Sequence, residues 1–534
     1  MRAFLHFLSG EVPGGVLLLF FVVLVINLAL YYLYNSSKLF TKEVYKRKAI
    51  RANIYIFGVY LVLWIFLEPP KLPERIIILP FQTEESVDYQ LAEAVQRQLY
   101  GNLGEDYILH RWEWIYATAN KDSFSYQDYR TRLASKIGGA SILGGNLTHT
   151  ESGLKVDLIV YSGQSLDKIS LDADNYWDAA SKVIERLRRN VSIPGETTIQ
   201  KEVMSDTYLQ DFCEAKITLL REDFERAIAK YETPDSIQVE LVTAAYLGKG
   251  ILELEERPDS PLEGDGMNRN FARLYNLIIP YSKEGKDTAD LNIILAKMYM
   301  HQGNYGMAEV CLERAVTQER YNSRIYYSMS FLHDSRYEEL GFNNRAEILT
   351  LAVQLDPGYN SAVYELADEL YTTGTAAPTN PNTIKSMEVL NDFLRLNPNS
   401  ENILSLLGRI LLQTKYTLEA MEIYQKLLLL DPQSAENHYN MGICYFHKRD
   451  YNSAKKEFNR ALEINDYADA YLYLGAMSRL EGDPERALYY YRERIKRKQG
   501  DDDQYAKEAM RGIRLILNDL AEKEEKTNGI RNSQ

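Results

Sequence analysis

The chain is 534 residues long, which is enough for two or three domains, and it carries a formal net charge of −14. An acidic chain of this kind is poorly suited to binding nucleic acid, so no nucleic-acid partner is predicted. Its three cysteines, Cys213, Cys311 and Cys444, are widely spaced without a CxxC pair, and its seven histidines are scattered. These patterns predict no disulfide framework, no metal site and no cofactor.

Two apolar runs stand near the start of the chain. Residues 16–34 are apolar apart from Asn27 and would rise about 28 Å as a helix, which matches the roughly 30 Å hydrocarbon core of a bilayer. Residues 54–67 would rise only about 21 Å, but charged residues at both ends can reach the interface. The runs together predict a transmembrane hairpin that anchors the chain through residues 1–68. A cleaved signal peptide is the alternative for the first run, and a buried or interfacial helix for the second.

The segment between the two runs is basic, with six cations against the single acidic residue Glu43. The cations are Lys38, Lys42, Lys46, Arg47, Lys48 and Arg51. Short loops this basic stay on the cytoplasmic side of a membrane. The prediction is therefore a chain anchored in the inner membrane, with residues 69–534 extracytoplasmic, in the periplasm of a bacterial cell. If residues 54–67 fail to span, the same rule places the bulk of the chain in the cytoplasm.

After a proline-rich linker, residues 75–195 alternate between short apolar strands and amphipathic helices. The predicted order is β-α-β-α-β-β-β-α, a small α/β domain. The strands are predicted at RIIILPF, YILHR, ASILGGNLTHT, LKVDLIVYSG and DKISLDAD. The helices are predicted at VDYQLAEAVQRQLYGNL, SYQDYRTRLASKIG and YWDAASKVIERLRRNVS.

This segment resembles the TolB-like amino-terminal domain, a small α/β domain of the bacterial envelope. The resemblance is carried by the strand IIILPF, the helix that ends in QLYGNL, and the hairpin KIGGASILGGNLTHTESGLKVDLIVYSG with Asp157 on its second strand. It covers residues 75–195 and implies a recognition or docking unit that performs no catalysis.

A register of about 34 residues returns in the C-terminal part of the chain. Gly408, Gly442 and Gly475 are each followed by a small residue at Ala420, Ala454 or Ala487, and then by an aromatic residue four positions later. The aromatic residues are Tyr424, Phe458 and Tyr491. The pattern is typical of tetratricopeptide (TPR) repeats, which are helix pairs stacked into a solenoid. TPR-type repeats are predicted over residues 196–500, and a capping helix with a tail over 501–534. The complete fold class is α + α/β: a transmembrane hairpin, a small α/β domain and an all-α solenoid.

The concave face of a TPR solenoid is lined by the second, fifth, ninth and twelfth positions of each pair's first helix. In the last three pairs the resulting candidates for a peptide groove are Arg409, Tyr439, Ile443, Phe446, Leu472 and Arg479. TPR domains that capture a C-terminal carboxylate carry Lys and Asn at the fifth and ninth positions, and this chain departs from that pattern. The candidates favour an apolar peptide or an amphipathic helix. The alternative is that they pack against a neighbouring repeat or the capping helix.

No catalytic constellation is present in the sequence, so the chain is not predicted to be an enzyme. The predicted function is a membrane-anchored, extracytoplasmic scaffold that holds other proteins in an envelope complex. The alternative function is an envelope sensor or regulator, or an accessory subunit of a transport system.

Overall fold

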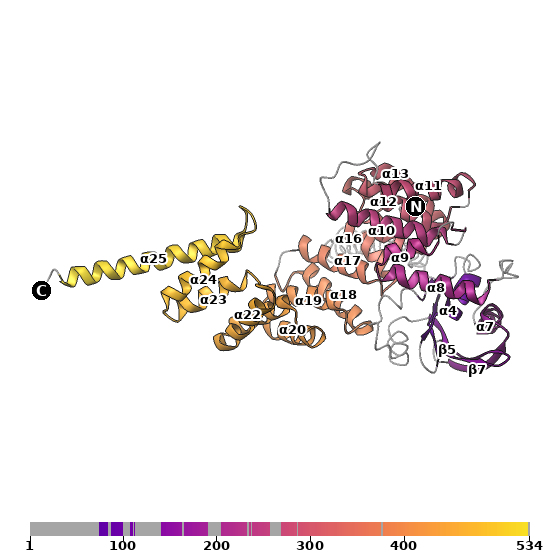
Figure 1. The fold of residues 1–534 in the computed structure, drawn as a ribbon, viewed down its shortest axis with the longest axis horizontal. Helices are drawn as coiled ribbons and strands as arrows, with labels where there is room; N and C mark the ends of the chain where they lie inside the picture. The colour runs from indigo at the N-terminus through magenta and orange to yellow at the C-terminus, as the bar shows by residue number, and fades with distance from the viewer. Residues whose placement is uncertain are drawn as a thin grey trace, which may run out of the picture. The chain divides into compact units, whose positions relative to one another are not determined.

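The structure is a computed structural model that describes residues 74–531, apart from 84–86, 100–106, 111, 113–139, 163–164, 191–203, 232–233, 236–237, 257–268, 286 and 375–376. The chain divides into two compact units, which we call unit 1 and unit 2 and describe separately (Figure 1). Unit 1 ends at Ala362 and unit 2 begins at Val363. The predicted domain boundaries stay predictions.

The predicted fold class is corrected in one respect, the transmembrane hairpin. The architecture is mostly helical, with helix pairs and one small sheet, and in the part of the chain that the structure describes no helix is long and apolar enough to cross a bilayer. The longest, α25 (Gln504–Arg531), illustrates the reason, because Lys, Arg, Asp and Glu recur along it. The same finding corrects the predicted inner-membrane and periplasmic location. The predicted anchor itself, residues 1–68 with the basic loop, lies outside the described residues.

Unit 1 begins with a seven-stranded mixed sheet. Its strands are β1 (Glu74–Ile78), β2 (Phe81–Gln82), β3 (Val87–Asp88), β4 (Tyr107–His110), β5 (Ala140–Thr150), β6 (Gly153–Ser162) and β7 (Ser165–Ala173). Strand β1 runs parallel to β4 on one side and to β5 on the other. Strands β5, β6 and β7 form an antiparallel meander, with Ile142 opposite Tyr161 and Leu158 opposite Ile169. All five predicted strands are confirmed. Those with apolar runs, such as β1, are buried, whereas β7 alternates apolar and polar residues and is largely exposed.

Helices α4 (Gln90–Leu99) and α7 (Tyr176–Asn190) pack on each other and on the sheet. Together with the sheet they enclose a core that contains Ile76, Ile78 and Val183, all fully buried. These helices confirm two of the three predicted for this segment, and the third, at SYQDYRTRLASKIG, lies outside the described residues. The TolB-like resemblance itself stays a prediction.

After the sheet region, the described residues of unit 1 are mainly helical (Figure 1). Its helices are α8 (Asp206–Leu220), α9 (Phe224–Ala229), α10 (Val239–Glu256), α11 (Arg269–Lys283), α12 (Ala289–His301), α13 (Tyr305–Gln318), α14 (Ser323–Met329), the 3₁₀ turn η1 (Asp334–Arg336), α15 (Tyr337–Leu340) and α16 (Arg345–Leu355). A continuous apolar core runs through the helices from α10 to α16 and includes Ile108 of the edge strand β4. The side chain of Arg75 on β1 also donates a hydrogen bond to the carbonyl oxygen of Gln354 at 2.6 Å. The sheet is therefore packed against the helices of the same unit.

Helix α14 is unusually short for the first helix of a repeat, because its last turn is replaced by a side-chain network. The hydroxyl of Tyr337 donates to the carbonyl oxygen of Ser330 at 2.8 Å, and Nε of Arg345 donates to the same oxygen at 3.0 Å. A carbonyl at a helix end needs such partners once no further helical turn supplies them. The chain then leaves the helix at Phe331, whose side chain is 42% exposed.

Helix α17 (Asn360–Thr373) contains the boundary between the units, and the helices after it belong to unit 2. They are α18 (Pro381–Leu396), α19 (Glu401–Gln413), α20 (Thr417–Leu430), α21 (Ala435–His447), α22 (Tyr451–Asn465), α23 (Ala470–Leu480), α24 (Pro484–Lys496) and α25. The close partners are α19 with α20, α21 with α22, and α23 with α24, while α25 packs on α23 and α24. The predicted helix pairs in this region are confirmed, and the role of α25 as a capping helix stays a prediction.

Candidate protein-binding site

The 34-residue register corresponds to a repeated close crossing between the two helices of each pair. A methyl group placed on Gly442 of α21 would lie 2.7 Å from the ring of Phe458 on α22. The same construction on Gly475 places the methyl 2.7 Å from Tyr491, and on Gly408 it places it 2.9 Å from Tyr424. Glycine is required at these positions because an aromatic ring of the partner helix occupies the space of a side chain.

We expect Gly442→Ala to destabilise the C-terminal repeats. Alanine is the better helix former by about 1 kcal/mol, but the ring of Phe458 would have to move, and overpacking of this kind costs about 1–3 kcal/mol. Urea unfolding followed by circular dichroism measures the net change. The matched control is Gly306→Ala on α13, where a methyl meets no atom within 4 Å and the substitution should stabilise the chain. Equal effects at both positions would contradict the crossing as the reason for the register.

Two of the six groove candidates are largely buried between helices. Tyr439 is 5% exposed and Ile443 is 8% exposed, and both belong to a core shared by α21, α22 and α23. The ring of Tyr439 lies 4.7 Å from that of Tyr467 and 5.9 Å from that of Tyr473, measured between centroids. These two candidates therefore lie where one repeat packs on the next, which is the alternative that the sequence left open.

Phe446 and Leu472 are half-buried. The ring of Phe446 meets that of Tyr473 edge-on at 5.3 Å and lies 5.7 Å from that of Tyr451. Leu472 packs beside a second cluster that contains Tyr491 of α24 and Ile516 of α25. Phe446 and Leu472 thus retain some exposed surface, while both contribute to contacts between successive helices.

The two arginine candidates are the exposed ones. Arg409 on α19 forms an ion pair with Asp368 on α17, with Nη2 and Oδ1 2.6 Å apart, and both side chains remain substantially exposed. Arg479 is exposed near the end of α23. An exposed pair like that of Arg409 contributes about 0–1 kcal/mol to stability, so its guanidinium group is available to a ligand at small cost. Arg479 interacts with the side chain of Tyr491.

Two tyrosines between these arginines, Tyr439 and Tyr473, are uncharged at physiological pH. Burial and the neighbouring hydroxyl of Tyr473 raise the pKa of Tyr439 far above its ordinary value. Burial also raises the pKa of Tyr473 to about 12. This part of unit 2 therefore has uncharged tyrosine side chains between its helices and exposed arginines on its surface.

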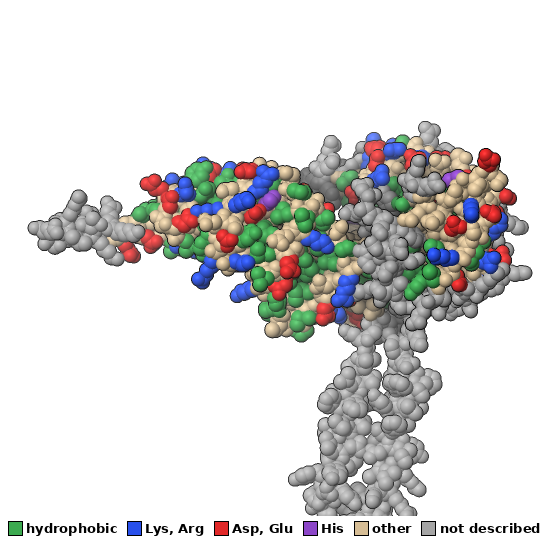
Figure 2. All heavy atoms as spheres, turned by 90° about the horizontal axis from the view of Figure 1, so that it is seen from below, with side chains coloured by type: hydrophobic (Ala, Val, Ile, Leu, Met, Phe, Trp, Pro, Cys, Tyr) green, Lys and Arg blue, Asp and Glu red, His purple; other side chains and the backbone are tan. Residues whose placement is uncertain are grey.

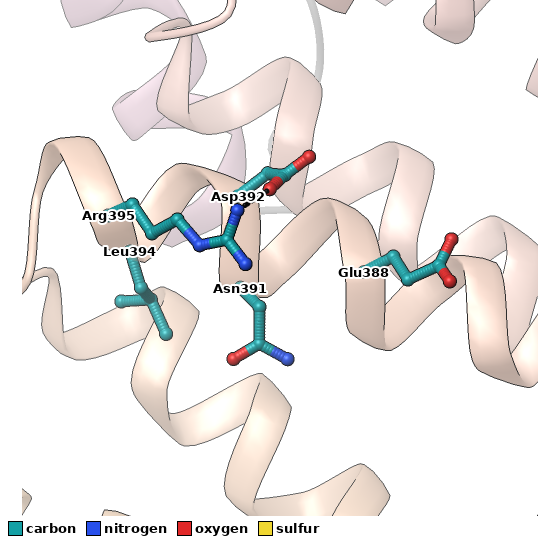
Figure 3. Close-up of a pocket in the computed structure, with 5 residues that line it drawn as sticks. All are labelled: Glu388, Asn391, Asp392, Leu394 and Arg395. Carbon is teal, nitrogen blue, oxygen red and sulfur yellow. Dashed lines mark hydrogen bonds and ion pairs between the residues drawn. The ribbon is translucent and has the colours of Figure 1, made fainter. Parts of the chain in front are cut away.

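A shallow hollow of about 540 Å³ on α18 does not add to this site (Figure 3). It is lined by Glu388, Asn391, Asp392, Leu394 and Arg395, all from one helix. Arg395 and Asp392 pair with each other at 3.1 Å, so their charges are already matched. In the described part of the chain, no group of three His, Cys, Asp or Glu side chains is arranged to hold a metal ion.

The same repeat positions that gave the six groove candidates also identify residues in earlier repeats. The sequence-based prediction did not extend to those repeats. For a repeat that begins at Ala289, Lys297 occupies the ninth position. In the next helix pair, Arg324, Tyr327 and Phe331 occupy the second, fifth and ninth positions. The signal was present in the sequence, but the shortened helix α14 made the second pair irregular.

Family models described as tetratricopeptide repeat match residues 289–322, 402–434 and 435–467. The chain is similar to the BBSome complex member BBS4 of Mus musculus, with 26% identity over 114 residues, which are 21% of this chain and 22% of that protein. It is also similar to the protein O-mannosyl-transferase TMTC3 of Homo sapiens, with 27% identity over 236 residues, or 40% of this chain and 25% of that protein. The chain thus spans a quarter or less of these relatives.

The chain is also similar to solved structures. One is from the APC/C hetero-tetramer Cut9-Hcn1, with 14% identity, a TM-score of 0.38, and coverage of 63% of this chain and 60% of that one. Another is YrrB, a TPR protein with an unusual peptide-binding site, with 17% identity, a TM-score of 0.29, and coverage of 38% and 96%. The family-model matches agree with the helix pairs and glycine crossings described above. The chain contains tetratricopeptide repeats, a fold that typically serves as a non-catalytic scaffold for interactions between proteins.

Proposed function

We propose that this chain is a protein-interaction scaffold that holds a partner polypeptide along the first helices of its last three repeats. The observation that carries the proposal is the combination of three successive TPR pairs with exposed Arg409 and Arg479 at groove positions. Phe446 supplies a half-buried aromatic surface between them along the chain. A partner segment with apolar side chains and acidic neighbours fits this set, because aromatic anchors and arginines are the residue types that dominate binding energy.

The two largely buried candidates have a different part in this proposal. Tyr439 and Ile443 hold α21 against α22 and α23, and through that packing they position Phe446. Substituting them would therefore disturb the repeat as well as the partner. The surface-exposed residues are the better test of binding, since surface substitutions usually change stability by less than about 0.5 kcal/mol. Figure 2 shows that hydrophobic side chains reach the surface among charged ones on the face of the C-terminal repeats that it displays.

We expect the double substitution Arg409→Glu and Arg479→Glu to release the partner. Each change replaces a cation by an anion in the proposed contact surface, and together they should weaken binding at least about tenfold. Affinity capture with the full chain, followed by mass spectrometry, compares the proteins retained by the wild type and by the variant. The matched control is Arg492→Glu, an exposed arginine on the second helix of the last pair. Proteins lost from both variants, or from neither, would contradict a groove on the first helices.

A further inference from the structure

A half-buried lysine on α12 of unit 1, Lys297, forms no ion pair with any residue that the structure describes. The ammonium nitrogen of Lys297 lies 6.0 Å from the centroid of the Tyr327 ring. Among the residues that the structure describes, no carboxylate lies within ion-pair distance of this nitrogen; the nearby Asp290 is paired elsewhere. A buried cation is normally paired, so a lysine in this position calls for an explanation.

The charges next to Lys297 leave an excess of one positive charge. Arg324 on α14 is paired with Asp290 on α12, with Nη1 and Oδ1 2.7 Å apart, so these two charges balance. Arg345 lies over the ring of Phe331 at 5.2 Å and donates from Nε to a backbone carbonyl, so it adds a cation on the Phe331 side of the cluster. Glu319 also interacts with Arg324 and adds one negative charge. The formal sum over Lys297, Arg324, Arg345, Asp290 and Glu319 is therefore +1. A single negative charge from a ligand would neutralise it.

The ring of Tyr327 next to the lysine belongs to a cluster of aromatic rings. The ring of Tyr327 lies 5.0 Å from that of Phe331 in an edge-on arrangement, and 4.9 Å from that of Tyr359. Phe331 is 42% exposed, because the chain leaves helix α14 just before it. An apolar group beside a bound anion could pack on this ring, as exposed aromatic side chains commonly do at protein interfaces.

The charged form of Lys297 destabilises the free protein. Burial and the positive charge of Arg324 lower its pKa to about 8, which means that the charged form is less stable here than in water. An uncharged side chain of the same length would avoid this cost. Binding residues often destabilise the free chain, and Lys297 does so at a groove position. Both features are expected of a residue that binds a ligand.

We propose that Lys297, together with Tyr327 and Phe331, binds one Asp or Glu carboxylate of a partner polypeptide that lies across α12 and α14. The single excess charge fits a carboxylate, whereas a phosphorylated side chain carries about −1.5 to −2 and would leave charge unbalanced. The site belongs to unit 1 and does not depend on the groove proposed in unit 2. It also differs from capture of a chain terminus, since one lysine and the adjacent rings can hold an internal acidic side chain.

Selection from a phage-displayed library of random dodecapeptides tests this proposal with the full chain. Peptides are selected on the wild type and then sorted by their binding to Lys297→Met, which keeps the side-chain length and removes the charge. We expect a class of peptides with Asp or Glu at one shared position, which loses at least about tenfold in affinity for the variant. Lys297→Arg should retain part of the binding. The control, Lys283→Met, removes an exposed lysine of α11 and should leave binding unchanged.

Three results would overturn the proposal. They are the absence of any peptide that distinguishes the wild type from Lys297→Met, a selected class without a shared acidic residue, and stronger competition by inorganic phosphate than by acetate. The last result would assign the site to phosphate instead of a carboxylate. A loss of binding by Lys283→Met as well would show that net charge, and not this position, governs the interaction.

Stability provides an independent readout. We expect Lys297→Met to raise the melting temperature of the free protein, because it removes a charge that is disfavoured by burial. The gain should be complete below about pH 8, the pKa of Lys297 in the folded chain, and should fade as the pH approaches the ordinary lysine value of 10.5. A lower melting temperature at neutral pH would show that the ammonium group stabilises the fold, and would remove the reason to assign it to a ligand.

Discussion

Phe458→Ala should lower the stability of the C-terminal repeats by about 3–5 kcal/mol, the usual cost of removing a buried aromatic ring. Phe458 is fully buried, and its ring stacks on that of Tyr473 with a centroid distance of 5.1 Å and an interplanar angle of 16°. It also occupies the space opposite Gly442, so its loss opens a cavity at the crossing of α21 and α22. Hydrogen exchange measured helix by helix should show lost protection in α21, α22 and α23.

The control for this substitution is Tyr489→Ala on α24, whose side chain is 55% exposed. It removes a ring from the surface and should change stability by no more than about 0.5 kcal/mol. Repeats depend chiefly on contacts with their neighbours, so the effect of Phe458→Ala should be strongest near α22 and weaker towards α18. Uniform loss of protection across unit 2 would contradict this local account.

Glu93→Gln should destabilise unit 1 by about 3 kcal/mol, because it removes the carboxylate that two largely buried cations, Arg97 and Lys216, share. The carboxylate of Glu93 is fully buried on α4 and accepts from Lys216 at 2.8 Å, from Arg97 at 2.6 Å and from the indole nitrogen of Trp112 at 2.7 Å. Lys216 belongs to α8, so its ion pair with Glu93 connects α8 to α4, which packs on the sheet. Urea unfolding monitored by tryptophan fluorescence measures the change.

The pH dependence of stability provides a second test of Glu93. Burial alone would raise its pKa, but the charges of Lys216 and Arg97 outweigh burial and lower the pKa to about 2. A carboxylate whose pKa is lowered on folding stabilises the folded state fully above its unfolded value of 4.5, and this stability is lost as the pH falls towards 2. The wild type should therefore lose its advantage over Glu93→Gln across that window. An advantage that is independent of pH would contradict the ion pair.

The control is Glu214→Gln on α8, which alters a surface network. Glu214 is about half exposed and pairs with Arg226 at 2.9 Å and with Lys230 at 2.6 Å. Solvent screens such pairs, so the substitution should cost about 0–1 kcal/mol. A similar loss for Glu214→Gln and Glu93→Gln would show that burial is not what makes the Glu93 pairs important.

The solenoid was the most predictable part of this protein. Gly442, Ala454 and Phe458 lie in a fixed register because two helices can cross closely only where a small residue faces a ring. The need for a small residue opposite a ring applies within one helix pair and recurs at a fixed period, so it can be recognised in the sequence. The strands of unit 1 were predictable for a related reason, since runs such as those of β1 and β5 are apolar and end at turn residues.

The candidate groove was less predictable. Position in a repeat indicates which face of a helix a residue occupies, but it does not indicate whether the next repeat covers that face. Tyr439 and Ile443 occupy groove positions and are buried by packing with neighbouring helices, whereas Arg409, at the position equivalent to Ile443, is exposed. Which case applies depends on the residues of the adjacent helices and on how closely they approach.

The sequence by itself determined the helix-pair period, the glycine and aromatic positions of each crossing, and the order of strands, because these depend on neighbours at fixed spacing. Only the tertiary structure brought Glu93 of α4 to Lys216 of α8, and Lys297 of α12 to Tyr327 of α14. The reason is physical: the charge state of a side chain depends on its burial and on its partners from other elements. Neither burial nor partner is specified by local spacing, so among the described residues Glu93 has two cations within ion-pair distance, whereas Lys297 has no carboxylate within that distance.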